Sequence, residues 1–290
     1  MDIHAALIQP FIEFGFMRRA LAACLALSLG CGPAGTLLVL RRMSLVGDAL
    51  SHAVLPGAAI GFMIAGLSLV VMSFGGFIAG LVVAGLSGLV ARVTPQREDA
   101  SFAAFYLISL ALGVLIVSTH GSNVDLMHVL FGTILAVDDA SLLLIVSIAT
   151  LTLFTLAVIG RGLIVECFDP GFLRAVGGPG AAVHFVFLVL VVMNLVAGFH
   201  ALGTLMAVGL MMLPAAAARF WAGQVATLAA ASSAIAFASA YAGLLLSYHV
   251  NLPSGPAIIL VAGGVYIVSV VAGPRGSLRT RFLPRRHLEA

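Results

Sequence analysis

Lysine is absent from this 290-residue sequence, and all fourteen basic residues are arginines. A P-loop needs a lysine to reach the phosphates of ATP, so the chain cannot handle ATP through that motif. Charged residues of both signs make up only 9% of the sequence, against roughly 25% in a soluble domain. The three cysteines, Cys24, Cys31 and Cys167, include no C-x-x-C pair and are too few for a disulfide framework.

Apolar residues dominate instead. They account for 62% of the sequence, and the mean hydropathy of +1.19 lies outside the range of soluble domains. Residues 141–160, SLLLIVSIATLTLFTLAVIG, form one of many runs close to the roughly 20 apolar residues that a helix needs to cross a bilayer. Such runs do not alternate between apolar and polar residues, as strands of a membrane barrel do. The composition therefore predicts an all-α, polytopic membrane protein.

We expect about nine transmembrane helices in a single membrane domain that covers residues 1–290. Each expected span is an apolar run bounded by short polar breaks. The expected spans are residues 18–40, 46–67, 69–91, 100–118, 141–160, 183–199, 201–221, 226–248 and 254–272.

The arginines predict which ends of these spans face the cytosol. If the tail at residues 273–290 is cytosolic, every arginine except Arg18 and Arg19 falls on the cytosolic side. This asymmetry is typical of inner-membrane proteins and predicts an outside N-terminus and a cytosolic C-terminus. Because the basic residues flank apolar runs and do not cluster in a soluble region, they indicate topology and give no support for nucleic-acid binding.

The longest expected cytosolic segment covers residues 161–182. Within it, Asp169 is a favourable N-cap and Pro170 suits the first position of a helix. Gly177 and Gly178 can end that helix. The segment therefore predicts a two-turn helix at the cytosolic face.

Two ionisable residues stand close together in the second expected span. Asp48 and His52 are four positions apart, so on a helix they share one face, with Cβ atoms about 6 Å apart. An ionisable group in a span is costly and usually faces a cavity or a partner. Carboxylate and imidazole are ligands of first-row divalent metals. Spacing alone leaves two interpretations open: a shared metal ion, or a pair that only caps or bridges the helix.

Three further residues are candidate metal ligands. Asp125 and His128, on the expected outer side, could relay a metal inward, or could be a helix cap and a polar loop residue. His200, near the outer end of its span, could supply a third ligand.

Five stretches of the sequence together resemble a known family. MSLVGDALSHAVLPGAAIGF closely resembles the motif of the permease subunits of metal-ion ABC importers, the zinc, manganese and iron family. The resemblance continues through VDLMHVLFGTIL, FDPGFLRAVG, HALGTLMAVGLMMLPAAAARF and LLLSYHVNLPSGPAIILVAG, in the family's order. It therefore extends over nearly the whole chain.

The resemblance implies a fold similar to the vitamin B12-type importer permeases, in the bacterial cytoplasmic membrane. It implies a homodimer that pairs with two ATP-binding cassette subunits and receives metal from an extracytoplasmic binding protein. The permease would then be no enzyme, would hold no permanent cofactor, and would contact lipid but no nucleic acid. By the same resemblance, Asp48 and His52 form the transit site for the metal.

The resemblance also assigns ATPase coupling to the helix after Asp169. The residues concerned are Phe168, Asp169, Pro170, Phe172 and Arg174. Here the sequence departs from the family, whose members commonly carry an acidic residue and an alanine at the positions of Gly171 and Leu173. Individual contacts with the ATPase are therefore not carried over.

Both zinc and manganese accept aspartate and histidine, and iron is a further option. The stretch GTLMAVGLMMLPAAAA looks closer to the zinc branch, so the sequence predicts Zn²⁺ as the transported ion. A proton-coupled secondary transporter is the alternative, but it is expected to carry ionisable residues across several spans. An intramembrane metalloenzyme finds no support, because no H-E-x-x-H motif or comparable constellation occurs.

Overall fold

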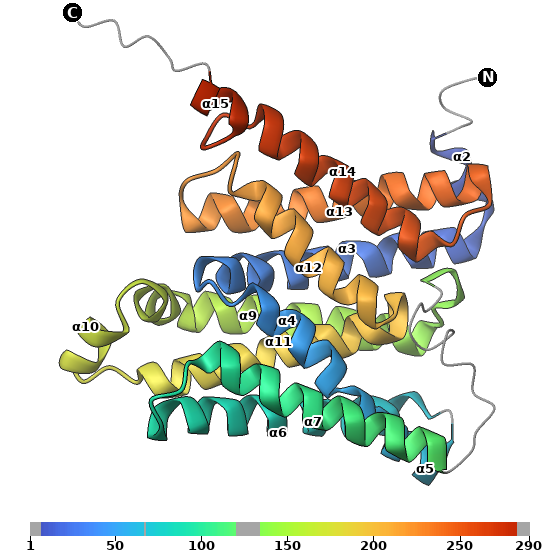
Figure 1. Ribbon diagram of the computed structural model, residues 1–290. Coiled ribbons are helices and arrows are strands. Elements are labelled where there is room, and N and C mark those ends of the chain that lie inside the picture. The colour runs from blue at the N-terminus through green and yellow to red at the C-terminus, as the bar shows by residue number, and fades with distance from the viewer. Residues whose placement is uncertain (1–6, 67, 120–133, 283–290) are drawn as a thin grey trace, which may run out of the picture.

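The computed structural model describes residues 7–66, 68–119 and 134–282, and within these ranges the chain is helical with no strand. Figure 1 shows long, roughly antiparallel helices stacked side by side, with α10 (Pro170–Ala175) projecting at one end of the bundle. The other helices are α2 (Gln9–Glu13), α3 (Gly15–Leu40), α4 (Ser44–Ala53), α5 (Leu55–Ala65), α6 (Leu69–Val93), α7 (Glu98–Thr119), η1 (Ile134–Ala136), α9 (Asp139–Phe168), α11 (Gly180–Leu202), α12 (Thr204–Ala218), α13 (Val225–Val250), α14 (Ser254–Ala272) and α15 (Leu278–Phe282).

Among the described residues, eight helical segments are long and apolar enough to cross a membrane. They match the expected spans except that of residues 201–221. There the structure has the shorter helix α12, because Gly203 separates it from α11 at a φ of 82°. Positive φ favours glycine, which has no Cβ to clash with the backbone. In place of the expected span at residues 201–221, the chain thus has an apolar helix of fifteen residues.

The second span is two helices and not one. α4 ends at Ala53 and α5 begins at Leu55, with Pro56 in the first turn of α5. Proline lacks an N–H group, so it interrupts the ladder of backbone hydrogen bonds. The hydroxyl of Ser109 on α7 donates to the Ala53 carbonyl at 3.1 Å and so satisfies one carbonyl at the break.

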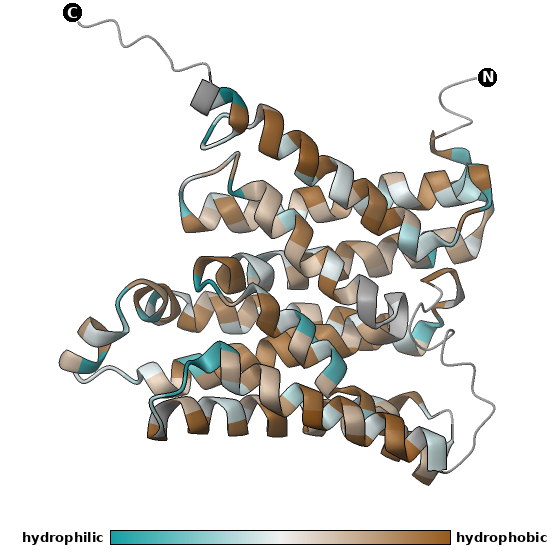
Figure 2. Ribbon diagram, viewed as in Figure 1, coloured by the Kyte–Doolittle hydropathy of each residue, from teal (hydrophilic) through white to brown (hydrophobic). Residues whose placement is uncertain are grey.

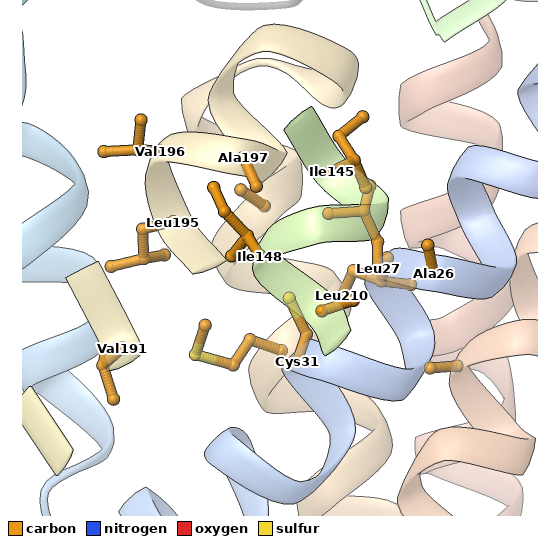
Figure 3. Close-up of a cluster of buried hydrophobic side chains, with 14 of the residues drawn as sticks. Ala26, Leu27, Cys31, Ile145, Ile148, Val191, Leu195, Val196, Ala197 and Leu210 are labelled. Atoms are coloured by element: carbon orange, nitrogen blue, oxygen red, sulfur yellow. The ribbon is translucent and has the colours of Figure 1, made fainter. Parts of the chain in front are cut away.

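The core of the bundle lies around α3 and α11, the most buried of the candidate spans. Figure 3 shows side chains of α3, α9, α11 and α12 meeting in one cluster. Ala26, Leu27 and Cys31 come from α3, Ile145 and Ile148 from α9, Val191, Leu195, Val196 and Ala197 from α11, and Leu210 from α12.

Two glycines of α5, Gly57 and Gly61, bring α5 and α6 into backbone contact. A Cβ atom on Gly57 would lie 2.0 Å from the carbonyl oxygen of Gly75, and one on Gly61 would lie 2.7 Å from that of Val71. Small residues allow this approach between membrane helices, where van der Waals packing drives association.

Hydropathy varies along each helix. In Figure 2 hydrophilic residues gather mainly at helix ends, while the helix bodies are apolar apart from hydrophilic segments such as those on α4. Large apolar side chains point outward along the bodies, including Val70, Phe154 and Leu260. In a membrane these side chains meet lipid, so their exposure carries no cost.

Candidate functional site

Helix α4 carries the pair predicted from the sequence. Asp48 lies in its second turn and His52 one turn further on. Asp48 Oδ1 and His52 Nε2 are 3.8 Å apart, so the two groups face each other along one side of the helix. This is longer than a good hydrogen bond and leaves the electron pairs of both groups available to a shared ligand.

The two side chains differ in how far they are covered. The Asp48 side chain is 53% exposed and that of His52 is 31% exposed. Leu45, one turn before Asp48, is also exposed. This face of α4 therefore presents a carboxylate and an imidazole on the surface of a membrane-embedded helix, an arrangement that normally requires a cavity or a protein partner.

The His52 ring also contacts helix α7. Its Nδ1 atom is buried and has no hydrogen-bond partner within the described part of the chain. The ring stacks on Tyr106 of α7, with centroids 6.3 Å apart and planes at 29°. The covered Nδ1 side leaves Nε2 as the ring nitrogen that faces Asp48.

The rest of α4 is anchored in the bundle. Val46, Leu50 and Ala53 are fully buried, and α4 packs against α6, α7, α11 and α12. The hydroxyl of Ser51 donates to the Asp48 carbonyl at 2.7 Å. Because the opposite face is fixed by packing, the exposed face is held in position.

The described residues supply only two close metal-ligating groups at this site. Across residues 7–66, 68–119 and 134–282, no three side chains of histidine, cysteine, aspartate or glutamate come together as a metal site. A closed zinc site has four ligands. One chain thus offers an open, incomplete ligand set.

The other candidate ligands lie where the structure does not describe their side chains. Asp125 and His128 lie outside the described residues, in the segment 120–133. His200 belongs to α11, but its side chain also lies outside the description.

The helix expected after Asp169 is α10. The Asp169 carboxylate accepts a hydrogen bond from the Phe172 backbone N–H at 2.8 Å, and Pro170 follows as the first helical residue. Gly177, at a φ of 72°, and Gly178 end the helix through hydrogen bonds to the Arg174 and Leu173 carbonyls.

Two aromatic side chains of this segment face outward. Phe168 is 65% exposed and Phe172 is 56% exposed, whereas Leu173 is buried and ties α10 to the bundle. Arg174 donates from Nε to the Pro170 carbonyl at 3.2 Å. Both phenylalanines are thus exposed where the chain projects from the end of the bundle.

Two residues that contact α4 are not predictable from the sequence. Tyr106 and Ser109 come from α7, more than fifty positions after His52. Both lie in an apolar run where a tyrosine and a serine are unremarkable. Their spacing of three residues, which places them on one helix face, is the only sequence signal that links them.

Comparison with known proteins gives consistent matches over almost the whole chain. The family described as "ABC 3 transport family" matches residues 13–273. The "Manganese import system permease protein ScaB" of Streptococcus gordonii is 30% identical over 286 residues, covering 97% of this chain and 99% of that protein. The "Manganese transport system membrane protein MntC" of Halalkalibacterium halodurans is 31% identical over 275 residues, covering 94% and 93%.

A more distant relative and two solved structures extend the pattern. The "Chelated iron transport system membrane protein YfeD" of Yersinia pestis is 27% identical over 271 residues, covering 93% of this chain and 90% of that protein. A chain of "PsaBC from Streptococcus pneumoniae in complex with Fab" superposes with a TM-score of 0.84 at 28% identity, covering 97% of this chain and all of that one. A "putative metal-chelate type ABC transporter" in an inward-facing conformation shares the fold, with a TM-score of 0.71 at 15% identity over 90% of this chain and 87% of that one.

Proposed function

The chain belongs to the ABC 3 transport family as a membrane permease of the metal-ion ABC importers, and on that premise we propose that it passes a divalent first-row metal ion into the cytosol. The metal comes from an extracytoplasmic binding protein, and a separate ATPase drives the movement. In this arrangement the N-terminus is outside and the C-terminus is cytosolic.

The observation that carries this proposal is the Asp48–His52 pair on α4. The 3.8 Å separation of Oδ1 and Nε2 lets both atoms bind one ion after a small side-chain adjustment. Metal–ligand distances near 2.0–2.2 Å place two ligands of one tetrahedral ion roughly 3.3 Å apart. Two ligands from one chain bind weakly enough for release, which suits a site through which an ion must pass.

A second copy of the chain completes the pathway in this proposal. The exposed face with Leu45, Asp48 and His52 needs a partner within the membrane, because an uncovered carboxylate there is costly. Two copies facing each other bring two Asp48–His52 pairs to one translocation path. The family membership and the TM-score of 0.84 to a chain of PsaBC support this arrangement.

Helix α10 is proposed as the contact with the ATPase. Phe172 of α10 and Phe168, the last residue of α9, offer exposed apolar anchors, and Arg174 of α10 offers a positive charge. Two ATPase subunits, one for each permease copy, would close on ATP binding and move the paired α10 helices. The metal site then opens alternately to the two sides of the membrane.

The two ligand types do not determine which metal ion is transported. The sequence predicts zinc, whereas the relatives described above are named for manganese and for chelated iron. Aspartate and histidine bind both zinc and manganese, and affinity alone favours zinc. Selectivity among these ions is expected to lie largely in the binding protein.

The test is metal uptake into proteoliposomes that contain the purified permease, with and without its ATPase and binding protein. Zinc and manganese are supplied separately, and wild type is compared with Asp48→Ala and His52→Ala. We expect ATP-dependent uptake that needs both partners and is lost in each variant while the complex still assembles. Uptake by the permease alone, driven by a proton gradient, would contradict the proposal and identify a secondary transporter.

A further inference from the structure

Four side chains from four helices meet next to α10. They are Arg41, Glu98, Glu166 and His184, called here the charge cluster. His184 Nε2 donates to Glu98 Oε1 at 2.8 Å, and its Nδ1 accepts from the Arg41 guanidinium. The same guanidinium lies 3.9 Å from Glu166 Oε1. His184 therefore bridges an arginine and a carboxylate, and Arg41 bridges His184 and a second carboxylate.

Three of the four side chains are largely buried although they are charged or polar, while that of Glu98 is 31% exposed. The side chains of Arg41, Glu166 and His184 are 8%, 13% and 10% exposed. The Arg41 guanidinium also lies over the Phe187 ring, 5.6 Å from its centroid. Burying a salt bridge usually brings little net stability, because desolvation offsets the attraction. A gain in stability alone therefore does not explain why these residues are grouped in the interior.

The positions of the four residues suggest a different reason. Glu166 precedes α10 in the last turn of α9, and His184 follows it in the first turns of α11. Arg41 caps the C-terminus of α3 just before α4, the helix of Asp48 and His52. Glu98 begins α7, the helix whose Tyr106 and Ser109 contact α4. The cluster thus ties both flanks of α10 to both helices around the candidate site.

One feature of Glu166 permits a second arrangement. Its Oε2 atom is buried without a hydrogen-bond partner within the described part of the chain, next to Gly180 at the start of α11. An unpaired buried carboxylate oxygen is costly. It is also an acceptor available to the Arg41 guanidinium when α9 and α11 shift relative to α3. A second pairing of the same groups would make this contact bistable, and bistable contacts are how small shifts are passed on in packed proteins.

We propose that the charge cluster couples movement of α10 to the Asp48–His52 site, with Arg41, Glu98, Glu166 and His184 as positioning residues. This inference rests on the proposed function, because it assumes that α10 receives the force of the ATPase. When α10 is displaced, Glu166 and His184 on its two flanks move with it. Their contacts with Arg41 and Glu98 shift those two residues as well. These residues in turn shift the start of α4 and of α7, and so the two walls of the site.

The test measures metal ions imported per ATP hydrolysed by the reconstituted complex of permease, ATPase and binding protein. The variants are Arg41→Gln, Glu166→Gln, His184→Gln and the double variant Arg41→Gln/Glu166→Gln. Arg97→Gln is the matched control, because Arg97 pairs with Asp99 at 3.4 Å but is 86% exposed. Copurification of the ATPase with each variant checks assembly.

We expect each cluster variant to lower the ratio of metal imported to ATP hydrolysed by about two- to thirtyfold, the range typical of residues that carry coupling. The double variant should fall no further than the lower single variant, because both changes break one unit. Arg97→Gln should keep the wild-type ratio, and Arg41→Lys, which keeps the charge, should recover part of the loss.

The inference would be overturned if the cluster variants kept the wild-type ratio of metal imported to ATP hydrolysed, even if both rates fell together. The cluster would then have a purely structural role. If Arg41→Gln does not assemble, the ratio measured for Glu166→Gln, His184→Gln and Glu98→Gln decides the question. Failure of the wild-type complex to import metal with ATP would instead overturn the proposed function, so the two failures are distinguishable.

Discussion

The rings of His52 and Tyr106 are stacked, with centroids 6.3 Å apart and planes at 29°, although the two residues belong to different helices. The contact covers one side of the imidazole and leaves Nε2 facing Asp48. A side chain binds a metal ion well only if its donor atom points toward the ion, and neighbouring groups commonly fix that orientation. We therefore predict that Tyr106 orients the histidine of the proposed transit site.

Replacement of Tyr106 tests this orienting role. Tyr106→Leu removes the aromatic ring and should lower ATP-dependent metal uptake by about tenfold or more, the effect typical of losing a group that orients a metal ligand. Tyr106→Phe keeps the ring and should transport at nearly the wild-type rate. If Tyr106→Phe is as impaired as Tyr106→Leu, the phenol hydroxyl matters and stacking is not the reason.

Gly57 is predicted to be essential for the contact between α5 and α6. The Cβ atom of Gly57→Ala would lie 2.0 Å from the Gly75 carbonyl oxygen. The helices must then separate, at a cost of about 1–3 kcal/mol for overpacking. The thermal midpoint of the purified protein in detergent should fall. Gly85→Ala, in α6 but with no atom within 4 Å of the added Cβ, should leave the midpoint unchanged or raise it, because alanine favours a helix more than glycine does.

Phe172 is predicted to anchor the ATPase. Phe172→Ala should weaken binding of the ATPase subunit by more than about 1 kcal/mol if this aromatic is an interface anchor, seen as reduced copurification with tagged permease. Phe154→Ala is the control, because Phe154 is similarly exposed but lies in the middle of α9. Equal copurification of the two variants would exclude Phe172 from the docking surface.

Asp138 is predicted to stabilise the start of α9. Its carboxylate accepts from the Ser141 backbone N–H at 2.9 Å, and hydrogen bonding by Ser141 lowers the pKa of Asp138 below its ordinary value. A lowered pKa means that the stabilisation is present above the ordinary pKa of aspartate and is lost as the pH falls through the lowered value. Asp138→Ala should cost about 0.5–2 kcal/mol at neutral pH, as for other N-caps.

Thermal midpoints at neutral and acidic pH measure the effect. The difference between wild type and Asp138→Ala should shrink at acidic pH. Asp139→Ala is the neighbouring control, because the interaction of Asp139 within the described part of the chain is an exposed salt bridge with Arg19, and such bridges contribute little. A larger loss for Asp139→Ala than for Asp138→Ala would contradict the capping role.

The sequence by itself determined the properties that depend on neighbours along the chain. The length of each apolar run predicts a membrane helix, because a helix rises a fixed distance per residue and the bilayer has a fixed thickness. Asp48 and His52 share a face because they are four residues apart on a helix. α10 could be predicted from Asp169, Pro170 and Gly177, since caps act on adjacent backbone groups.

Only the tertiary structure decided which distant residues meet. Tyr106 and Ser109 contact α4 because α7 packs against it, and nothing local in their apolar run indicates that partner. The cluster around Arg41 joins four helices through residues separated by as many as 143 positions. Each of its members reads in the sequence as a polar residue near a helix end, and nothing next to it in the sequence indicates its partners. The long-range packing that pairs them is a property of the whole bundle, because every helix must bury its contact face against another.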